Sequence, residues 1–204
     1  MNNIIKFPKG KSQTISRIYE AYDSEKYNVV CSFKDELVES VELFKDTDLF
    51  DILLESYFQL FLFDEVIMVN DELLKKGYES FDTIYFTLLS HIALVDIYQA
   101  KSLIKKSKIL NNESVKHFYS NDGANYNNIL SLNNDVFYET SLCLLIVNFV
   151  NEVSKEMLGD IEVDKEYLLY RFFDLINVVY ELGYEDSIIK ELDRVLRIVF
   201  QIEV

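Results

Sequence analysis

Residues 50–66 read FDILLESYFQLFLFDEV and residues 84–100 read IYFTLLSHIALVDIYQA, and the two stretches match at an offset of 34. Leu54 aligns with Leu88 in this match, and apolar residues recur three and four positions apart in both stretches. That spacing is typical of amphipathic helices. A short break separates two such patterns in each stretch, so the chain is predicted to repeat a hairpin of two helices.

A third copy of the pattern, LGYEDSIIKELDRVLRI, lies near the C-terminus. It places Gly183 and Tyr184 at the turn, and it has Ser187 where the other copies have Val66 and Ala100. A small residue at this point lets the two helices of a hairpin approach closely. With its period of 34 and a Gly-plus-aromatic turn, the chain resembles the tetratricopeptide-repeat family.

The resemblance implies an all-α fold, an α-α superhelix or solenoid of tetratricopeptide-like hairpins with an irregular insertion. Asn-rich sequence with the turn signal Asn121-Asp122-Gly123 marks that insertion. The expected organisation is a basic flexible leader at 1–12 and a single domain at 13–204, with repeats at 46–79, 80–113 and 167–200 and the insertion at about 114–134.

Composition supports the helical class and limits the partners. The chain has only five Gly and one Pro, whereas a β-sandwich needs many turns. Its formal net charge is −15, and such a surface repels phosphate backbones, so we expect no direct nucleic-acid binding. The same acidity leaves an alternative function open, an acidic nucleic-acid mimic that inhibits a DNA- or RNA-binding protein.

The basic leader contains Gly10-Lys11-Ser12, which matches the end of a phosphate-binding loop. That loop also needs a Gly where this chain has Ile5, so no nucleotide cofactor is expected. The plainer interpretation is a solvated arm. Its alternative is an arm that docks on an acidic surface, including one of its own molecule.

Cysteine use and hydropathy predict a cytoplasmic protein. Cys31 and Cys143 lie far apart and have no metal-binding or redox spacing, which favours reduced thiols. The start of the chain lacks the apolar segment of a signal peptide. No apolar run approaches the roughly 20 nearly uncharged residues that a membrane span needs, so no membrane partner is expected.

No pattern of chemically reactive residues predicts catalysis. His91 repeats the interior position of Tyr57, which favours a core histidine, and His117 has no second metal ligand at helical spacing. Acid pairs such as Asp64-Glu65 fall at helix starts, where they complement the helix dipole. We therefore expect no catalytic, cofactor-binding or metal site, although an enzyme built from dispersed residues stays open.

The resemblance also implies a groove lined by the first helix of each hairpin. An acidic end and an apolar middle would suit a basic or amphipathic protein or peptide, which makes the chain a non-enzymatic binding scaffold or adaptor. Alternatively, the aromatic residues pack on the inserted helix and fill the groove. The groove residues expected are Asp48, Asp51, Glu55, Phe58, Gln59, Tyr85, Leu89, Phe172, Ile176 and Tyr180.

The C-terminal stretch RVLRIVFQIEV has no polar capping helix after it. The end of a solenoid normally needs such a cap for solubility. Its apolar face is therefore expected either to fold back on the protein or to bind a second copy in a homodimer.

Overall fold

A computed structural model describes residues 11–45, 47–116, 138–158, 164–181 and 187–200. All regular elements in these ranges are helices, and the ranges contain no strand, which confirms the all-α prediction. The chain forms two compact units, Met1–Tyr78 and Glu79–Val204. The superhelix and the single domain over 13–204 stay predictions, because both concern how the two units combine.

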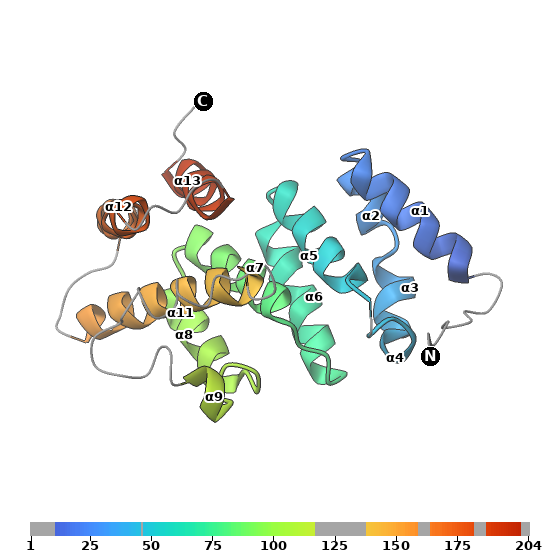
Figure 1. Ribbon diagram of the computed structural model, residues 1–204, viewed down its shortest axis with the longest axis horizontal. Helices are drawn as coiled ribbons and strands as arrows, with labels where there is room; N and C mark the ends of the chain where they lie inside the picture. Colours follow the sequence, from blue (N-terminus) through green and yellow to red (C-terminus); the bar gives the residue numbers. More distant parts are fainter. Residues whose placement is uncertain (1–10, 46, 117–137, 159–163, 182–186, 201–204) are drawn as a thin grey trace. The chain divides into compact units, whose positions relative to one another are not determined.

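The helices of the N-terminal unit are α1 (Lys11–Asp23), α2 (Tyr27–Cys31), α3 (Lys34–Glu39), α4 (Val41–Phe44), α5 (Leu49–Gln59) and α6 (Phe63–Lys75). Helices α5 and α6 pack together as a hairpin (Figure 1). Helices α1 and α2 pack against α5, and α3 contacts both α5 and α6. Helix α5 is therefore the central element of this unit.

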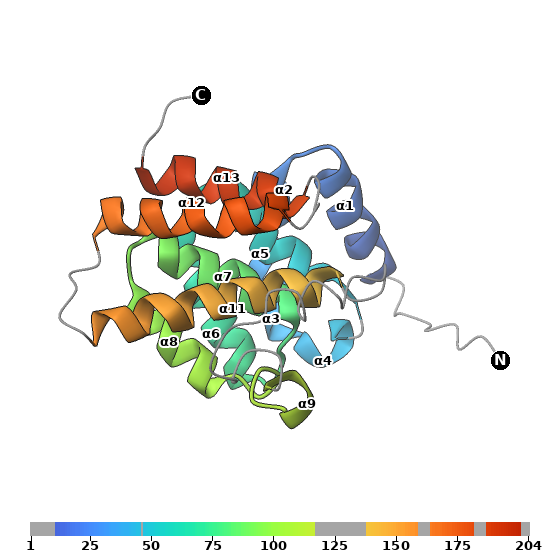
Figure 2. The ribbon, with the colours of Figure 1, turned by 60° about the vertical axis from the view of Figure 1, so that its left-hand side comes forward.

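The helices of the C-terminal unit are α7 (Phe81–Ala93), α8 (Ile97–Lys106), α9 (Glu113–Lys116), α11 (Tyr138–Met157), α12 (Lys165–Glu181) and α13 (Ser187–Phe200). Helices α7 and α8 form a hairpin, and α11 packs along both of them (Figure 2). Helices α12 and α13 lie side by side, and α13 also contacts α7.

Each unit has an apolar core of its own. Phe44, Phe50 and Phe58 are fully buried in the N-terminal unit. In the C-terminal unit, the rings of Phe149 and Phe172 stack with their centroids 4.4 Å apart, and both side chains are buried. Burial of these large apolar side chains is the main favourable term in folding each unit.

The two central hairpins turn through the same backbone conformation. Phe61 and Val95 both have φ of 60°, in the left-handed region. The N–H groups of the next residues, Leu62 and Asp96, donate to the carbonyl oxygen five residues earlier, at 3.0 and 2.7 Å. Helices α6 and α8 begin two residues after the left-handed position. These two turns are 34 positions apart in the chain, and a third left-handed residue, Glu25, has φ of 54°.

Two helix ends have a clear local cause. Helix α6 ends at Lys75, and Gly77 follows with φ of 83° and its N–H bonded to the Leu74 carbonyl at 3.0 Å. Glycine populates this left-handed conformation without the steric penalty of a Cβ. At the start of α12, the Asp164 carboxylate accepts a hydrogen bond from the Tyr167 N–H at 2.9 Å, as an N-cap does.

Some predicted features lie wholly or partly outside the described residues. Of the leader, only Lys11 and Ser12 are described, and they begin α1. The expected insertion is described only as far as Lys116, so its remainder and His117 lie outside.

Candidate functional site

The structure buries four of the expected groove residues in the cores of their own units. Phe58 is buried in the N-terminal unit, and Tyr85, Leu89 and Phe172 are buried in the C-terminal unit. Buried side chains stabilise the fold and offer no surface to a ligand. Any binding surface on these helices has to use their other faces.

Two expected groove acids, Asp48 just before α5 and Glu55 within it, accept hydrogen bonds from tyrosines of α1. The Tyr19 hydroxyl donates to the Asp48 carboxylate, and the Tyr22 hydroxyl donates to Oε2 of Glu55 at 2.5 Å. Gln59 Nε2 donates to the other oxygen of Glu55 at 3.4 Å. These side chains therefore join α1 to α5 within the N-terminal unit.

The two phenols hold their protons more tightly than free tyrosine does. Partial burial, then the hydrogen bond and the negative charge of Asp48, raise the pKa of Tyr19 from 10.0 to about 12. The pKa of Tyr22 is raised by burial and by Glu55 in the same way. A neutral phenol is a hydrogen-bond donor to a carboxylate, whereas a phenolate would repel it.

We expect the N-terminal unit to lose stability above about pH 10. Because the folded-state pKa lies above the unfolded value, the stabilisation from Tyr19 and Tyr22 is complete below about pH 10 and is lost as the pH rises toward about 12. The double variant Tyr19→Phe/Tyr22→Phe should lose less stability over this interval, measured by urea unfolding followed by circular dichroism. A Tyr98→Phe control should behave like the parent, and a double variant as steep as the parent would contradict the expectation.

An exposed row of aromatic side chains lies on α12. Tyr170, Phe173 and Tyr180 have exposed fractions of 63%, 50% and 61%, and Asn177 between them is exposed as well. Their spacing of three, four and three residues places them on one face of the helix. The opposite face carries the buried residues Leu168, Phe172, Leu175 and Val179.

Acidic residues accompany this row. Glu166 and Asp174 are exposed and fall on the same side of α12 by helical spacing. The described residues of this side include no Lys or Arg. Together these side chains form the α12 aromatic face, made of Glu166, Tyr170, Phe173, Asp174, Asn177 and Tyr180.

Charged groups fix the position of α12 on α11. The Arg171 guanidinium lies 3.1 Å from Glu152, 3.4 Å from Glu156 and 3.7 Å from Asp174. The Tyr167 hydroxyl also donates to Glu156. With the Phe149–Phe172 ring stack, these contacts hold the inner side of α12 in place while its aromatic face stays open.

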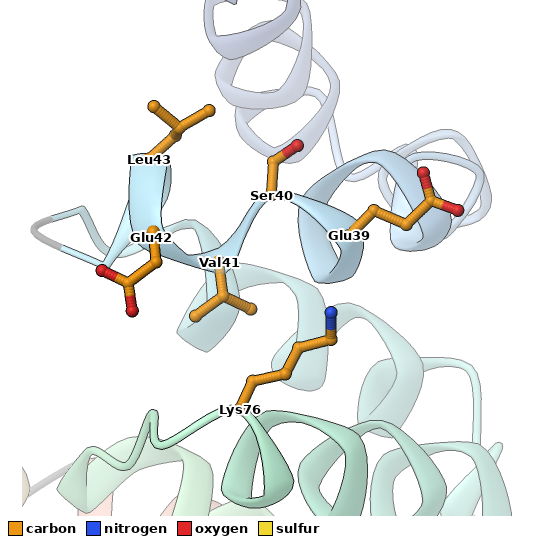
Figure 3. Close-up of a pocket in the computed structure, with 6 residues that line it drawn as sticks. All are labelled: Glu39, Ser40, Val41, Glu42, Leu43 and Lys76. Atoms are coloured by element: carbon orange, nitrogen blue, oxygen red, sulfur yellow. The ribbon is translucent and has the colours of Figure 1, made fainter.

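A hollow of about 350 Å³ lies on the surface of the N-terminal unit (Figure 3). Figure 3 shows Lys76 extending toward the turn that joins α3 to α4. The lining residues are Glu39, Ser40, Val41, Glu42, Leu43 and Lys76. This hollow is open to solvent and has no buried polar group in its lining, so we assign no ligand to it.

Neither the thiols nor the acids form a recognisable reactive centre in the described residues. Burial raises the pKa of Cys31 to about 12 and also raises the pKa of Cys143, so both thiols are protonated at neutral pH, whereas the thiolate is the nucleophile. His91 is buried, as expected for a core histidine. Among described His, Cys, Asp and Glu side chains, none gather in a group of three or more suited to a metal ion.

The apolar side of α13 folds back on its own unit. Leu192, Val195 and Leu196 are buried, and α13 packs against α12 and α7. The sequence left two ways to cover the C-terminal apolar face, by folding back on the protein or by binding a second copy. In the described residues, this face folds back. The homodimer stays a prediction and gains no support from this helix.

No helix in the described part of the chain has the length and hydropathy that crossing a bilayer requires. Comparison with protein-family models, curated proteins and solved structures finds no match. Function is therefore inferred from the exposed chemistry of each unit.

The expected groove residues on α12 differ in their exposure. Tyr180 is exposed and Ile176 is half-buried, whereas Phe172 is buried. Tyr170 was missing from the expected set, although its spacing of three from Phe173 and ten from Tyr180 is a readable helical signal. In the N-terminal unit Asp51 is half-buried.

Proposed function

We propose that the protein is a non-enzymatic interaction module that binds a basic, amphipathic protein segment on the α12 aromatic face. The observation that carries this proposal is the row of exposed Tyr170, Phe173 and Tyr180 on one helix that is held firmly from behind. Single exposed apolar residues are common on protein surfaces, but a contiguous row is typical of an interaction site.

The chemistry of this face favours a basic partner. Aromatic rings attract Lys and Arg by cation–π contacts of about 0.5–2 kcal/mol each, and tyrosine combines a large apolar area with a hydroxyl. Glu166 and Asp174 add negative charge beside the rings, which accelerates association with a cationic segment. Apolar residues of the same segment would cover Phe173.

The repeated turn supports the finer architectural proposal, a solenoid related to tetratricopeptide repeats. The left-handed residues Phe61 and Val95 are 34 positions apart, and each is followed by the second helix of a hairpin. Val66 and Ala100, at the expected helix crossings, are both fully buried. The unpaired Cys31 and Cys143 also favour the proposed cytoplasmic location.

A synthetic amphipathic peptide of Lys, Arg and Leu tests the binding proposal. We expect the parent protein to bind the fluorescein-labelled peptide, and Tyr170→Ala/Phe173→Ala to weaken binding about tenfold or more, since each residue would supply more than about 0.7 kcal/mol. Fluorescence anisotropy measures the affinity. Leu94→Ala/Tyr98→Ala, which removes two exposed apolar side chains of the same unit, is the matched control.

Equal affinity of the aromatic-face variant and the control would contradict the proposal. Salt separates it from the acidic-mimic alternative. Binding through rings and apolar contacts should persist when salt is raised from about 0.15 M to about 1 M, whereas binding that depends on charge alone should be largely lost.

A further inference from the structure

A basic surface interrupts this acidic chain on α8. Residues 97–112 contain Lys101, Lys105, Lys106 and Lys108 and no acidic residue, although the chain as a whole has 35 acids and 20 bases. Lys105, Lys106 and Lys108 are exposed and Lys101 is half-buried. Positive charge is therefore concentrated on one short element of the C-terminal unit.

A second helix joins this surface. Lys101 Nζ donates a hydrogen bond to the side-chain oxygen of Asn151 on α11. Burial and, next, the positive charges of Lys105 and Lys155 lower the pKa of Lys101. Ammonium groups from α8 and α11 are thus close enough to repel one another.

Some other cations of the described residues are compensated within the fold. Lys34 lies 3.2 Å from Glu72, and Arg197 lies 2.7 Å from Asp193. Between described residues, Lys101 and Lys105 make no ion pair with any carboxylate. In a chain so rich in acids, a carboxylate one helical turn away would remove this repulsion, so its absence leaves an unneutralised surface that an anionic partner would stabilise.

We propose that this surface, defined as the α8 lysine face of Tyr98, Lys101, Lys105 and Lys108, docks an acidic segment of a partner protein. Tyr98 is 67% exposed and precedes Lys101 by three positions, so its ring lies on the same side of the helix as the ammonium groups of Lys101 and Lys105. Lys108 follows two residues after the helix ends at Lys106. A segment with carboxylates and one apolar or aromatic side chain would complement both features.

The charge of the whole chain favours a protein segment over nucleic acid. A net charge of −15 repels a long polyanion, whose phosphates extend well beyond this small surface. A short acidic segment carries few charges and keeps them next to the lysines. Lysine also lacks the planar fork with which arginine binds phosphate bidentately. This docking surface lies on helices other than α12, so it goes beyond the function proposed above.

The test uses a fluorescein-labelled Glu-rich peptide with a central tyrosine and an oligo(dT) strand of equal charge. We expect the full-length parent to bind the peptide more tightly than oligo(dT) at about 0.15 M salt. Lys101→Glu/Lys105→Glu should weaken peptide binding about tenfold or more. Lys26→Glu/Lys75→Glu, which makes the same change of net charge at exposed lysines of the N-terminal unit, should leave it unchanged.

Two further variants make the outcome decisive. Lys105→Gln/Lys108→Gln changes only exposed side chains and adds no negative charge beside Glu79, whose carboxylate accepts hydrogen bonds from the Lys108 and Ile109 N–H groups. This variant should therefore keep the parent's circular dichroism spectrum and still weaken peptide binding. Tyr170→Ala/Phe173→Ala should bind the acidic peptide normally, which separates this surface from the α12 aromatic face. The proposal is overturned by no binding of the peptide to the parent, by equal weakening in the Lys26/Lys75 control, or by tighter binding of oligo(dT) than of the peptide.

Discussion

The variant Phe172→Ala is expected to lower the free energy of unfolding of the C-terminal unit by about 4 kcal/mol, because removing a fully buried phenyl ring leaves a cavity. Phe172 is fully buried, and its ring stacks on Phe149 from the neighbouring helix α11. The substitution therefore removes apolar burial and an aromatic contact between two helices of the core.

The next residue along the chain supplies the control. Phe173 is half exposed on the α12 aromatic face, so Phe173→Ala should change the free energy of unfolding by no more than about 0.5 kcal/mol. Urea unfolding of the full chain, followed by circular dichroism and tyrosine fluorescence, measures both variants. Similar losses from the two neighbouring substitutions would show that α12 is rotated about its axis relative to the structure described above.

The sequence was sufficient to predict the helical class and the pairing of neighbouring helices. Spacings of three and four identified the hairpin of α5 and α6, and α6 ends where Gly77 adopts the left-handed conformation. Asp164 acts as the N-cap of α12 because its carboxylate accepts a hydrogen bond from a free N–H group of the first turn. These are local effects, determined by residues within a few positions of one another.

Which face of a helix is exposed to solvent was harder to predict from the sequence. Helix α12 has aromatic residues on both faces, so periodicity alone does not decide whether Phe172 or Phe173 is buried. The predicted groove acids Asp48, at the N-cap of α5, and Glu55, within α5, bind tyrosines of α1 that lie 29 and 33 positions away in the chain. Such long-range contacts leave no periodic signal in a single sequence.

The lysine face of α8 shows that the net charge of a chain does not predict the charge of each part of its surface. A net charge of −15 is an average over the chain, and it conceals sixteen consecutive positions, 97–112, without an acid. The structure adds that Lys101 lies against α11 near Lys155. Charge that is averaged over a sequence excludes classes of partner for the whole surface, but it does not describe each helix.

The variant Arg171→Leu should produce the other large loss of stability. Its guanidinium lies within 4 Å of carboxylates of Glu152, Glu156 and Asp174, and its side chain is mostly buried. Removing it leaves these acids without their shared cation, next to one another and partly shielded from water. Because these carboxylates are 30–49% exposed, the loss should be smaller than for a fully buried pair, about 2 kcal/mol.

Arg197→Leu is the matched control, because Arg197 pairs with Asp193 on one exposed side of α13 and such surface pairs contribute less than about 1 kcal/mol. Urea unfolding measures both variants. Adding Glu152→Gln should restore part of the stability of Arg171→Leu, since it removes one of the uncompensated negative charges, while the same change alone should destabilise the parent. Equal losses from the two arginine substitutions, or no restoration by Glu152→Gln, would mean that apolar packing, not this ion network, holds α12 in the orientation that exposes its aromatic face.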